Sequence, residues 1–209
     1  MIVAVGEARE RGTTELSILH AARECGTSCA FFGMISSDEE GHAVLQDLVS
    51  KDILFDPSLC GSSYRQSEAG DHLEGGLLLE AFRVNTDIRV VYVKGRNDAL
   101  TAVLEHYSPR PIVVAEPRDG CLFDGADILL LENGRPASKP VFCVTDSGLA
   151  FLFPDGRRIE TVGRHHSLAE SEGLFLASLH DAGCFGDDGA APRLRLDEKA
   201  IRKALEAAC

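Results

Sequence analysis

The sequence predicts a single α/β domain, built on a doubly wound, mainly parallel β-sheet that is flanked by helices. Two observations support this prediction. Short apolar segments alternate with helical patterns in the N-terminal quarter of the chain, an order that is typical of parallel βαβ units. The chain has 209 residues, 44% of them hydrophobic, which is enough for one well-buried core.

The N-terminal quarter contains two strand–helix units. An apolar strand at residues 2–5 is followed by a helical pattern that ends at Gly26, a typical helix C-cap. A second strand covers residues 28–32. The next helix begins at Ser37 or Asp38, because both residue types are favourable N-caps.

The middle of the chain breaks the parallel pattern. Residues 60–76 are polar and rich in serine and glycine, which predicts a loop. Residues 77–82 and 88–93 have the composition of two strands that pair antiparallel. We expect them to form a small β lid, over about residues 64–94, outside the main sheet. A short helix is predicted at residues 99–106.

Strands dominate the rest of the chain. Three apolar strands are separated by loops rich in glycine and proline, with little helical sequence between them: residues 112–115, 128–131 and 141–144. Residues 149–161 form a predicted hairpin around a Pro-Asp-Gly turn. A helix at about residues 168–180 and a last helix capped by Asp197 complete a domain that we expect to span residues 1–209.

The charge balance argues against several classes of partner. Lysine and arginine number 21 against 33 acidic residues, which gives a net charge of −12. Such a chain is unsuited to nucleic acids and to anionic membranes, because both attract basic surfaces. Apolar runs fall far short of the roughly 20 residues of a membrane span. The first residues lack the features of a signal peptide, so we expect a cytoplasmic protein.

The seven cysteines form no recognisable metal or disulfide pattern. They contain no CxxC pair, and Cys25 and Cys29 have no second cysteine or histidine pair at a matching spacing. We therefore expect reduced, mostly buried thiols and no metal site. A cysteine nucleophile stays an alternative, although nothing in the sequence singles one out.

The order of segments is more specific than any generic motif. The sequence has no Walker loop, no GxGxxG after its first strand and no GxSxG elbow. The turn after the second strand, however, matches the form G-x-x-G-x-D-x-x-G at Gly33, Asp38 and Gly41, with Ser36 in place of the second glycine. This turn lies between a strand and a helix, and it resembles the turn found at the same point in the ribokinase-like (PfkB-type) carbohydrate kinases.

Later segments follow the order of that family. Residues 113–117 resemble the strand that ends in Asp-Pro-Asn, and residues 144–148 resemble the turn that contacts the nucleotide. Residues 162–179 are similar to the signature helix. The resemblance spans nearly the whole chain and implies a ribokinase-like fold with a reduced β lid. It also implies Thr145 and Gly148 as nucleotide contacts, and ATP with Mg²⁺ as the cofactor of a working site.

The segment that carries catalysis in the family is altered here. The family signature, Asp-Thr-x-Gly-Ala-Gly-Asp, places backbone N–H groups against the transferred phosphoryl group, and its last Asp takes the proton of the sugar hydroxyl. Counting back from the matched helix end puts Ala169 at that position, with Leu168 and His166 in place of the glycines. Alanine has no proton acceptor, so we expect inefficient phosphotransfer.

The other candidate residues fall into two groups. Sugar or nucleoside contacts are expected near the first helix and after the lid, at Gly12, Thr13, Ser17 and Arg96, although the family has asparagine in place of Ser17. A replacement anion site is conceivable from side chains before the signature helix: Arg164, His165, His166 and Ser167. The alternative for this second group is a solvated loop with a capping box between Ser167 and Glu170.

Three hypotheses about function follow. The first is a sugar-kinase homologue without efficient phosphotransfer, a pseudokinase that keeps a ligand or a partner. The second is an active ATP-dependent carbohydrate or nucleoside kinase with an unusual site. Glu170 or Glu172 would then be a displaced base, but Glu170 is accounted for by capping and Glu172 is expected to point elsewhere. The third is a non-catalytic interaction protein, which would form a homodimer through the lid strands.

Overall fold

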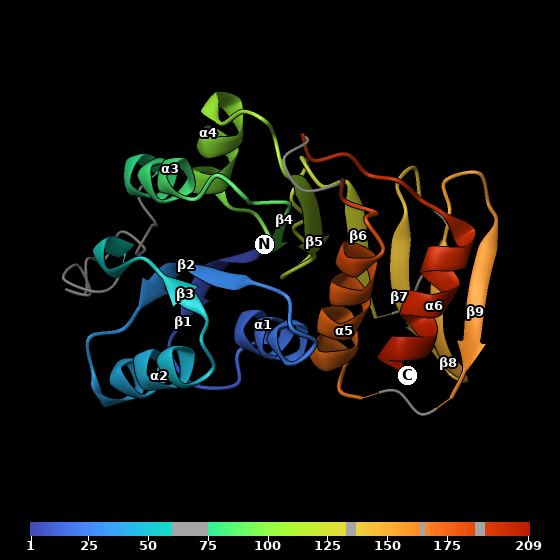
Figure 1. The fold of residues 1–209 in the computed structure, drawn as a ribbon, viewed down its shortest axis with the longest axis horizontal. Coiled ribbons are helices and arrows are strands. Elements are labelled where there is room, and N and C mark those ends of the chain that lie inside the picture. Colours follow the sequence, from blue (N-terminus) through green and yellow to red (C-terminus); the bar gives the residue numbers. More distant parts are fainter. Residues whose placement is uncertain (60–74, 133–136, 164–165, 187–190) are drawn as a thin grey trace.

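A computed structural model describes residues 1–59, 75–132, 137–163, 166–186 and 191–209. These residues form a nine-stranded sheet in the order β3-β2-β1-β4-β5-β6-β7-β8-β9 (Figure 1). Every pair from β3 to β7 is parallel, and β8 and β9 are added antiparallel. The predicted mainly parallel sheet is therefore confirmed.

The strands are β1 (Ile2–Ala8), β2 (Cys29–Ile35), β3 (Leu54–Phe55), β4 (Val90–Lys94), β5 (Ile112–Glu116), β6 (Ile128–Leu131), β7 (Val141–Thr145), β8 (Gly148–Leu152) and β9 (Arg158–Val162). The helices are α1 (Thr14–Glu24), α2 (Glu39–Ser50), α3 (Gly75–Val84), α4 (Asp98–His106), α5 (Leu168–Asp181) and α6 (Glu198–Ala208), with a 3₁₀ turn η1 at Pro57–Leu59.

The helices cover the two faces of the sheet unequally (Figure 1). One core lies under α1, α2, α5 and α6, and a second core lies under α3 and α4. β1 contributes side chains to both cores: Ile2 and Ala4 belong to the first, and Val3 and Val5 belong to the second. A strand buried on both faces is an unbroken apolar run, which explains why the sequence signals the central strands so clearly.

The prediction of a β lid was wrong for the part of it that the structure describes. Residues 77–82 lie within helix α3, where Leu78, Ala81 and Phe82 are buried at helical spacing. Strand β4 is paired with β1 on one side and β5 on the other, in the middle of the sheet. A homodimer through lid strands thus has no basis in residues 75–94. Residues 64–74 lie outside the described residues.

Other sequence expectations are confirmed. No helix separates β5, β6 and β7 within the described residues, and β8 and β9 form the predicted hairpin. Asp38 and Asp197 cap α2 and α6 through their side chains. Helix α5 packs closely on α1 because Gly173 lies against it: a Cβ at this glycine would be 2.4 Å from the carbonyl oxygen of Ile18.

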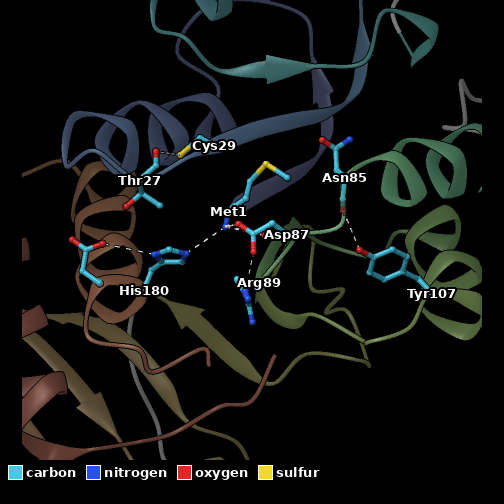
Figure 2. A network of polar contacts seen from close by, with 9 residues as sticks. Met1, Thr27, Cys29, Asn85, Asp87, Arg89, Tyr107 and His180 are labelled. Atoms are coloured by element: carbon cyan, nitrogen blue, oxygen red, sulfur yellow. Dashed lines mark hydrogen bonds and ion pairs between the residues drawn. The ribbon is translucent and has the colours of Figure 1, made fainter. Parts of the chain in front are cut away.

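A polar network joins the start of β1 to the end of α5 (Figure 2). The amino group of Met1 donates a hydrogen bond to the Asp87 carbonyl at 3.0 Å and lies 3.3 Å from Nε2 of His180. Nε of the buried Arg89 donates to Oδ1 of Asp87 at 3.2 Å. The network lies at the amino ends of β1 and β4, opposite the strand ends described below.

Among the described residues, no helix has the length and apolar character needed to cross a membrane.

Candidate functional site

Polar side chains gather at the carboxyl ends of β4 and β5, in the position where parallel α/β sheets usually bind ligands. Lys94 and Glu116 are the last residues of these strands and are partners in the register. Their side chains form an ion pair, with 2.9 Å between Nζ and Oε1. The buried Tyr92 donates its hydroxyl to the other carboxylate oxygen of Glu116 at 2.5 Å.

Helix α1 begins beside this ion pair and adds to it. Nζ of Lys94 donates to the hydroxyl of Thr14 at 3.0 Å. Glu15, which is 6% exposed, has its pKa raised mainly by burial, while Lys94 opposes the increase. Gly6 on β1 makes room for that side chain, because a Cβ there would be 3.0 Å from the Glu15 carboxylate.

Glu172 on α5 completes the group, which we call the strand-end cluster: Glu15, Tyr92, Lys94, Glu116 and Glu172. Its side chain is fully buried, and neither carboxylate oxygen has a hydrogen-bond partner among the described residues. Burial raises the pKa of Glu172 to about 9, and the charge of Glu116 adds to the increase. Glu172 is therefore a neutral carboxylic acid at pH 7.

The expectation that Glu172 points elsewhere on the helix was wrong. Residues three apart lie on the same side of a helix, so Glu172 shares the side of Ala169, one turn further into the domain. Its electrostatic coupling to Glu116 and Lys94 agrees with this position. Glu170, by contrast, is fully exposed and belongs to the capping of the helix.

The N-terminus of α5 is occupied by its own side chains. The hydroxyl of Ser167 accepts a hydrogen bond from the Glu170 backbone N–H at 3.4 Å, and Glu170 accepts one from the Ser167 N–H at 3.0 Å. This capping box confirms the structural alternative for Ser167 and Glu170. Ala169 is half-buried in the first turn, and its methyl group packs against the first core.

The proposed replacement anion site is only partly described. Arg164 and His165 lie outside the described residues. His166 is exposed. The pKa of Glu170 is held below its usual range mainly by hydrogen bonds from Ser167, and His166 makes a smaller contribution in the same direction. The described part of this segment thus places a carboxylate where an anion would have to bind.

The expected nucleotide contacts lie in the turn between β7 and β8, where they bond to each other. The hydroxyl of Thr145 accepts from the Gly148 backbone N–H at 3.1 Å and donates to Glu160 Oε1 at 3.1 Å. Ser147 donates to the same carboxylate oxygen at 3.2 Å. The other oxygen of the Glu160 carboxylate pairs with Arg158, at 3.1 Å from Nη2, so the polar groups of this turn already have partners within the domain.

The expected sugar contacts are divided between two places. Gly12, at a φ of +80°, and Thr13 precede α1, and the buried hydroxyl of Thr13 has no hydrogen-bond partner among the described residues. Ser17 is half-buried one turn later. Arg96 does not join them: it is exposed at the start of α4, and its Nε donates to Oδ1 of Asp98 at 2.7 Å.

The strand-end cluster itself was missed by the sequence analysis. Lys94 and Glu116 each end an apolar run, and charged residues at the ends of neighbouring parallel strands are a usable signal. The signal was hidden because residues 88–93 were assigned to a lid outside the sheet.

Neither an ATP site nor a metal site is evident in these residues. No group of three or more His, Cys, Asp or Glu residues in the described ranges could hold a metal ion. ATP with Mg²⁺ does not fit the start of α5, because the capping box already uses the backbone N–H groups of Ser167 and Glu170 and places the Glu170 carboxylate there.

Comparisons with known proteins identify the fold. No family model and no curated protein matches the sequence. The structure is similar to ribokinase from Giardia lamblia, with a TM-score of 0.66 and 13% identity over 99% of this chain and 92% of that one. It is also similar to ATP-bound fructokinase from Xylella fastidiosa, with a TM-score of 0.67 and 14% identity over 99% and 90% of the two chains.

A third similar structure is an uncharacterised sugar kinase from Pyrococcus horikoshii in complex with ATP, with a TM-score of 0.65 and 10% identity over 100% of this chain and 89% of that one. Identities this low show a shared fold and leave the chemistry to the residues of each chain. The mostly parallel sheet of this chain, with its flanking helices, thus has the ribokinase-like fold.

Proposed function

We propose that this chain is a sugar-kinase homologue that binds a neutral polyhydroxylated ligand, a sugar or nucleoside, and does not transfer phosphate efficiently. The start of α5 carries the proposal: Ala169 supplies no base, and the capping box of Ser167 and Glu170 uses two backbone N–H groups of the helix terminus. Loss of a general base costs about 10²–10⁴-fold in rate. Loss of an oxyanion site costs roughly another 10²–10³-fold.

Glu172 does not replace the missing base. A general base must be ionised to take a proton from an alcohol, whereas burial keeps this carboxyl protonated, with a pKa of about 9. The side chain is also fully buried, out of reach of a hydroxyl group in solvent. The hypothesis of an active kinase with an unusual site therefore gains no support from this residue.

The strand-end cluster supports ligand binding. It places an ammonium group and a carboxylate, both partly exposed, at the edge of the sheet where α/β proteins bind small molecules, and the buried Tyr92 holds the carboxylate in position. The unpartnered Thr13 hydroxyl lies next to Thr14, which Lys94 contacts. Alternating donors and acceptors suit the hydroxyl groups of a polyol. Ribokinase and fructokinase, whose structures are similar, act on sugars according to their names.

The first experiment measures ADP release with ATP, Mg²⁺ and a panel of pentoses, hexoses and nucleosides. We expect no sugar-dependent release above the background of heat-inactivated protein. Release by the unmodified chain, saturable in one of these compounds, would establish an active kinase and refute the proposal that phosphotransfer is inefficient.

The second experiment measures the melting temperature with each compound in the absence of nucleotide. A ligand at about 100 times its dissociation constant stabilises the folded state by about 2.7 kcal/mol, which corresponds to roughly 5–10 °C in a domain of this size. We expect Lys94→Met to abolish the shift, and Lys51→Met, which removes an exposed lysine after α2, to retain it. No shift with any compound would refute ligand binding and favour an interaction protein.

A further inference from the structure

We propose a second binding site, for a small organic ammonium ion with an apolar body, in the cavity between α4 and residues 122–125. This α4 cavity has a volume of about 400 Å³. Cavities that bind small molecules typically have volumes of about 300–1,000 Å³ and combine an apolar lining with a few polar groups. The α4 cavity has both kinds of lining.

The apolar part of the lining comes from both sides. Leu104 extends from α4, and Leu122 and Phe123 come from the segment between β5 and β6. Phe123 is 4% exposed and belongs to the second core, so this part of the wall is fixed by packing. An apolar ligand body would therefore meet a preformed surface.

The two arginine residues of the lining are already paired. Arg96 donates to Asp98 at 2.7 Å. Arg110 donates to both carboxylate oxygens of Asp127, at 3.2 and 3.0 Å, and to the Gly125 carbonyl. These guanidinium groups have little capacity left for an anionic ligand.

Two carboxylates of the lining form no salt bridge among the described residues. Glu105 and Asp124 are exposed, and neither forms a salt bridge within the described part of the chain. The lining holds three carboxylates, of Asp98, Glu105 and Asp124, against the guanidinium groups of Arg96 and Arg110. The pKa of Arg96 is raised mainly by its hydrogen bond to Asp98, and the charge of Asp124 contributes to the increase. The excess negative charge beside an apolar wall selects a cation that carries apolar surface, and the net charge of −12 attracts such a ligand.

The α4 cavity is separate from the strand-end cluster. Helix α4 covers the second core, whereas α1 and α5, which carry Glu15 and Glu172, cover the first core on the opposite face of the sheet. Arg96, expected from the sequence to contact a sugar, lines this cavity instead. The proposal therefore does not depend on the proposed sugar site.

The test is a calorimetric titration with 2-phenylethylamine and with its neutral counterpart 2-phenylethanol. We expect the amine to bind and the alcohol to bind at least several-fold more weakly. Glu105→Gln and Asp124→Asn should each weaken amine binding about three- to tenfold, the range for one charge-assisted contact at an exposed site. Glu206→Gln, at an exposed position of α6, is the matched control and should leave the affinity unchanged.

Each contrary outcome is decisive. Equal binding of amine and alcohol would reduce the cavity to an apolar contact and overturn the proposed selectivity. Absence of amine binding, or an affinity that neither charge variant changes, would overturn the site itself. Both substituted residues are exposed, so a loss of binding without a change in melting temperature separates a binding role from a folding role.

Discussion

Glu172→Gln tests the central feature of the strand-end cluster, a buried carboxyl group that is protonated at neutral pH. The folded-state pKa is about 9 against an ordinary value of 4.5. A raised pKa in the folded state means that the contribution to stability is complete below pH 4.5 and decreases as the pH rises towards 9. Between pH 5 and pH 8 the loss is about 1.4 kcal/mol per pH unit, or about 4 kcal/mol in total.

Glutamine has nearly the same shape as the protonated acid and does not titrate. The difference in unfolding free energy, Glu172→Gln minus the unmodified protein, should therefore rise by about 4 kcal/mol between pH 5 and pH 8. A constant cost of about 1–3 kcal/mol, for the two amide N–H donors without partners, shifts the difference equally at each pH and leaves its slope unchanged.

The assay is urea unfolding of both proteins at four pH values from 5 to 8, with Glu206→Gln as an exposed control. The urea dependence should be the same for all three proteins, because each exposes nearly the same surface on unfolding. If the stability curves of the unmodified protein and Glu172→Gln run parallel across this range, the carboxyl is ionised when folded, and the assignment of a neutral acid fails.

Three further substitutions, all in or next to α5, probe the fold. Ser167→Ala removes the cap of α5 and should lower the unfolding free energy by about 1 kcal/mol, measured in urea. Gly173→Ala places a methyl group 2.4 Å from the Ile18 carbonyl and should cost about 1–3 kcal/mol or more in the same assay. The pKa of His180 is lowered by burial and by the Met1 amino group, so its contribution to stability is present above pH 6.5 and is lost as the pH falls below that value. The melting temperature of His180→Gln should accordingly depend less steeply on pH between 7 and 5.

The sheet was predictable because its central strands are buried on both faces. β2 is buried along its whole length, and such a run has no polar alternation to obscure it. The error in the middle of the chain arose from a short apolar run, residues 77–82, whose length does not distinguish a helix from a strand. The helical spacing of its buried residues can be recognised only from the packing of α3 against the second core.

The site was predictable in part. The cap of Ser167 followed from local sequence, and the structure confirms it at the start of α5. That Ala169 replaces a base is implied by the family resemblance and stays a prediction. The strand-end cluster depends on which strands are neighbours, and the chain order does not give that information: β4 lies beside β1 although β2 and β3 come between them in sequence. The burial of Glu172 depends further on the orientation of α5 against that edge.

Charge connects the altered catalytic segment with the kind of ligand that the strand ends can accept. A nucleotide phosphate at the start of α5 would meet the carboxylate of Glu170, whose pKa is held below its usual range by hydrogen bonds from Ser167. A neutral polyol meets no such repulsion and can exchange hydrogen bonds with Lys94 and Glu116. On the proposed function, the start of α5 therefore disfavours a phosphate, while the adjoining edge of the sheet suits an uncharged ligand.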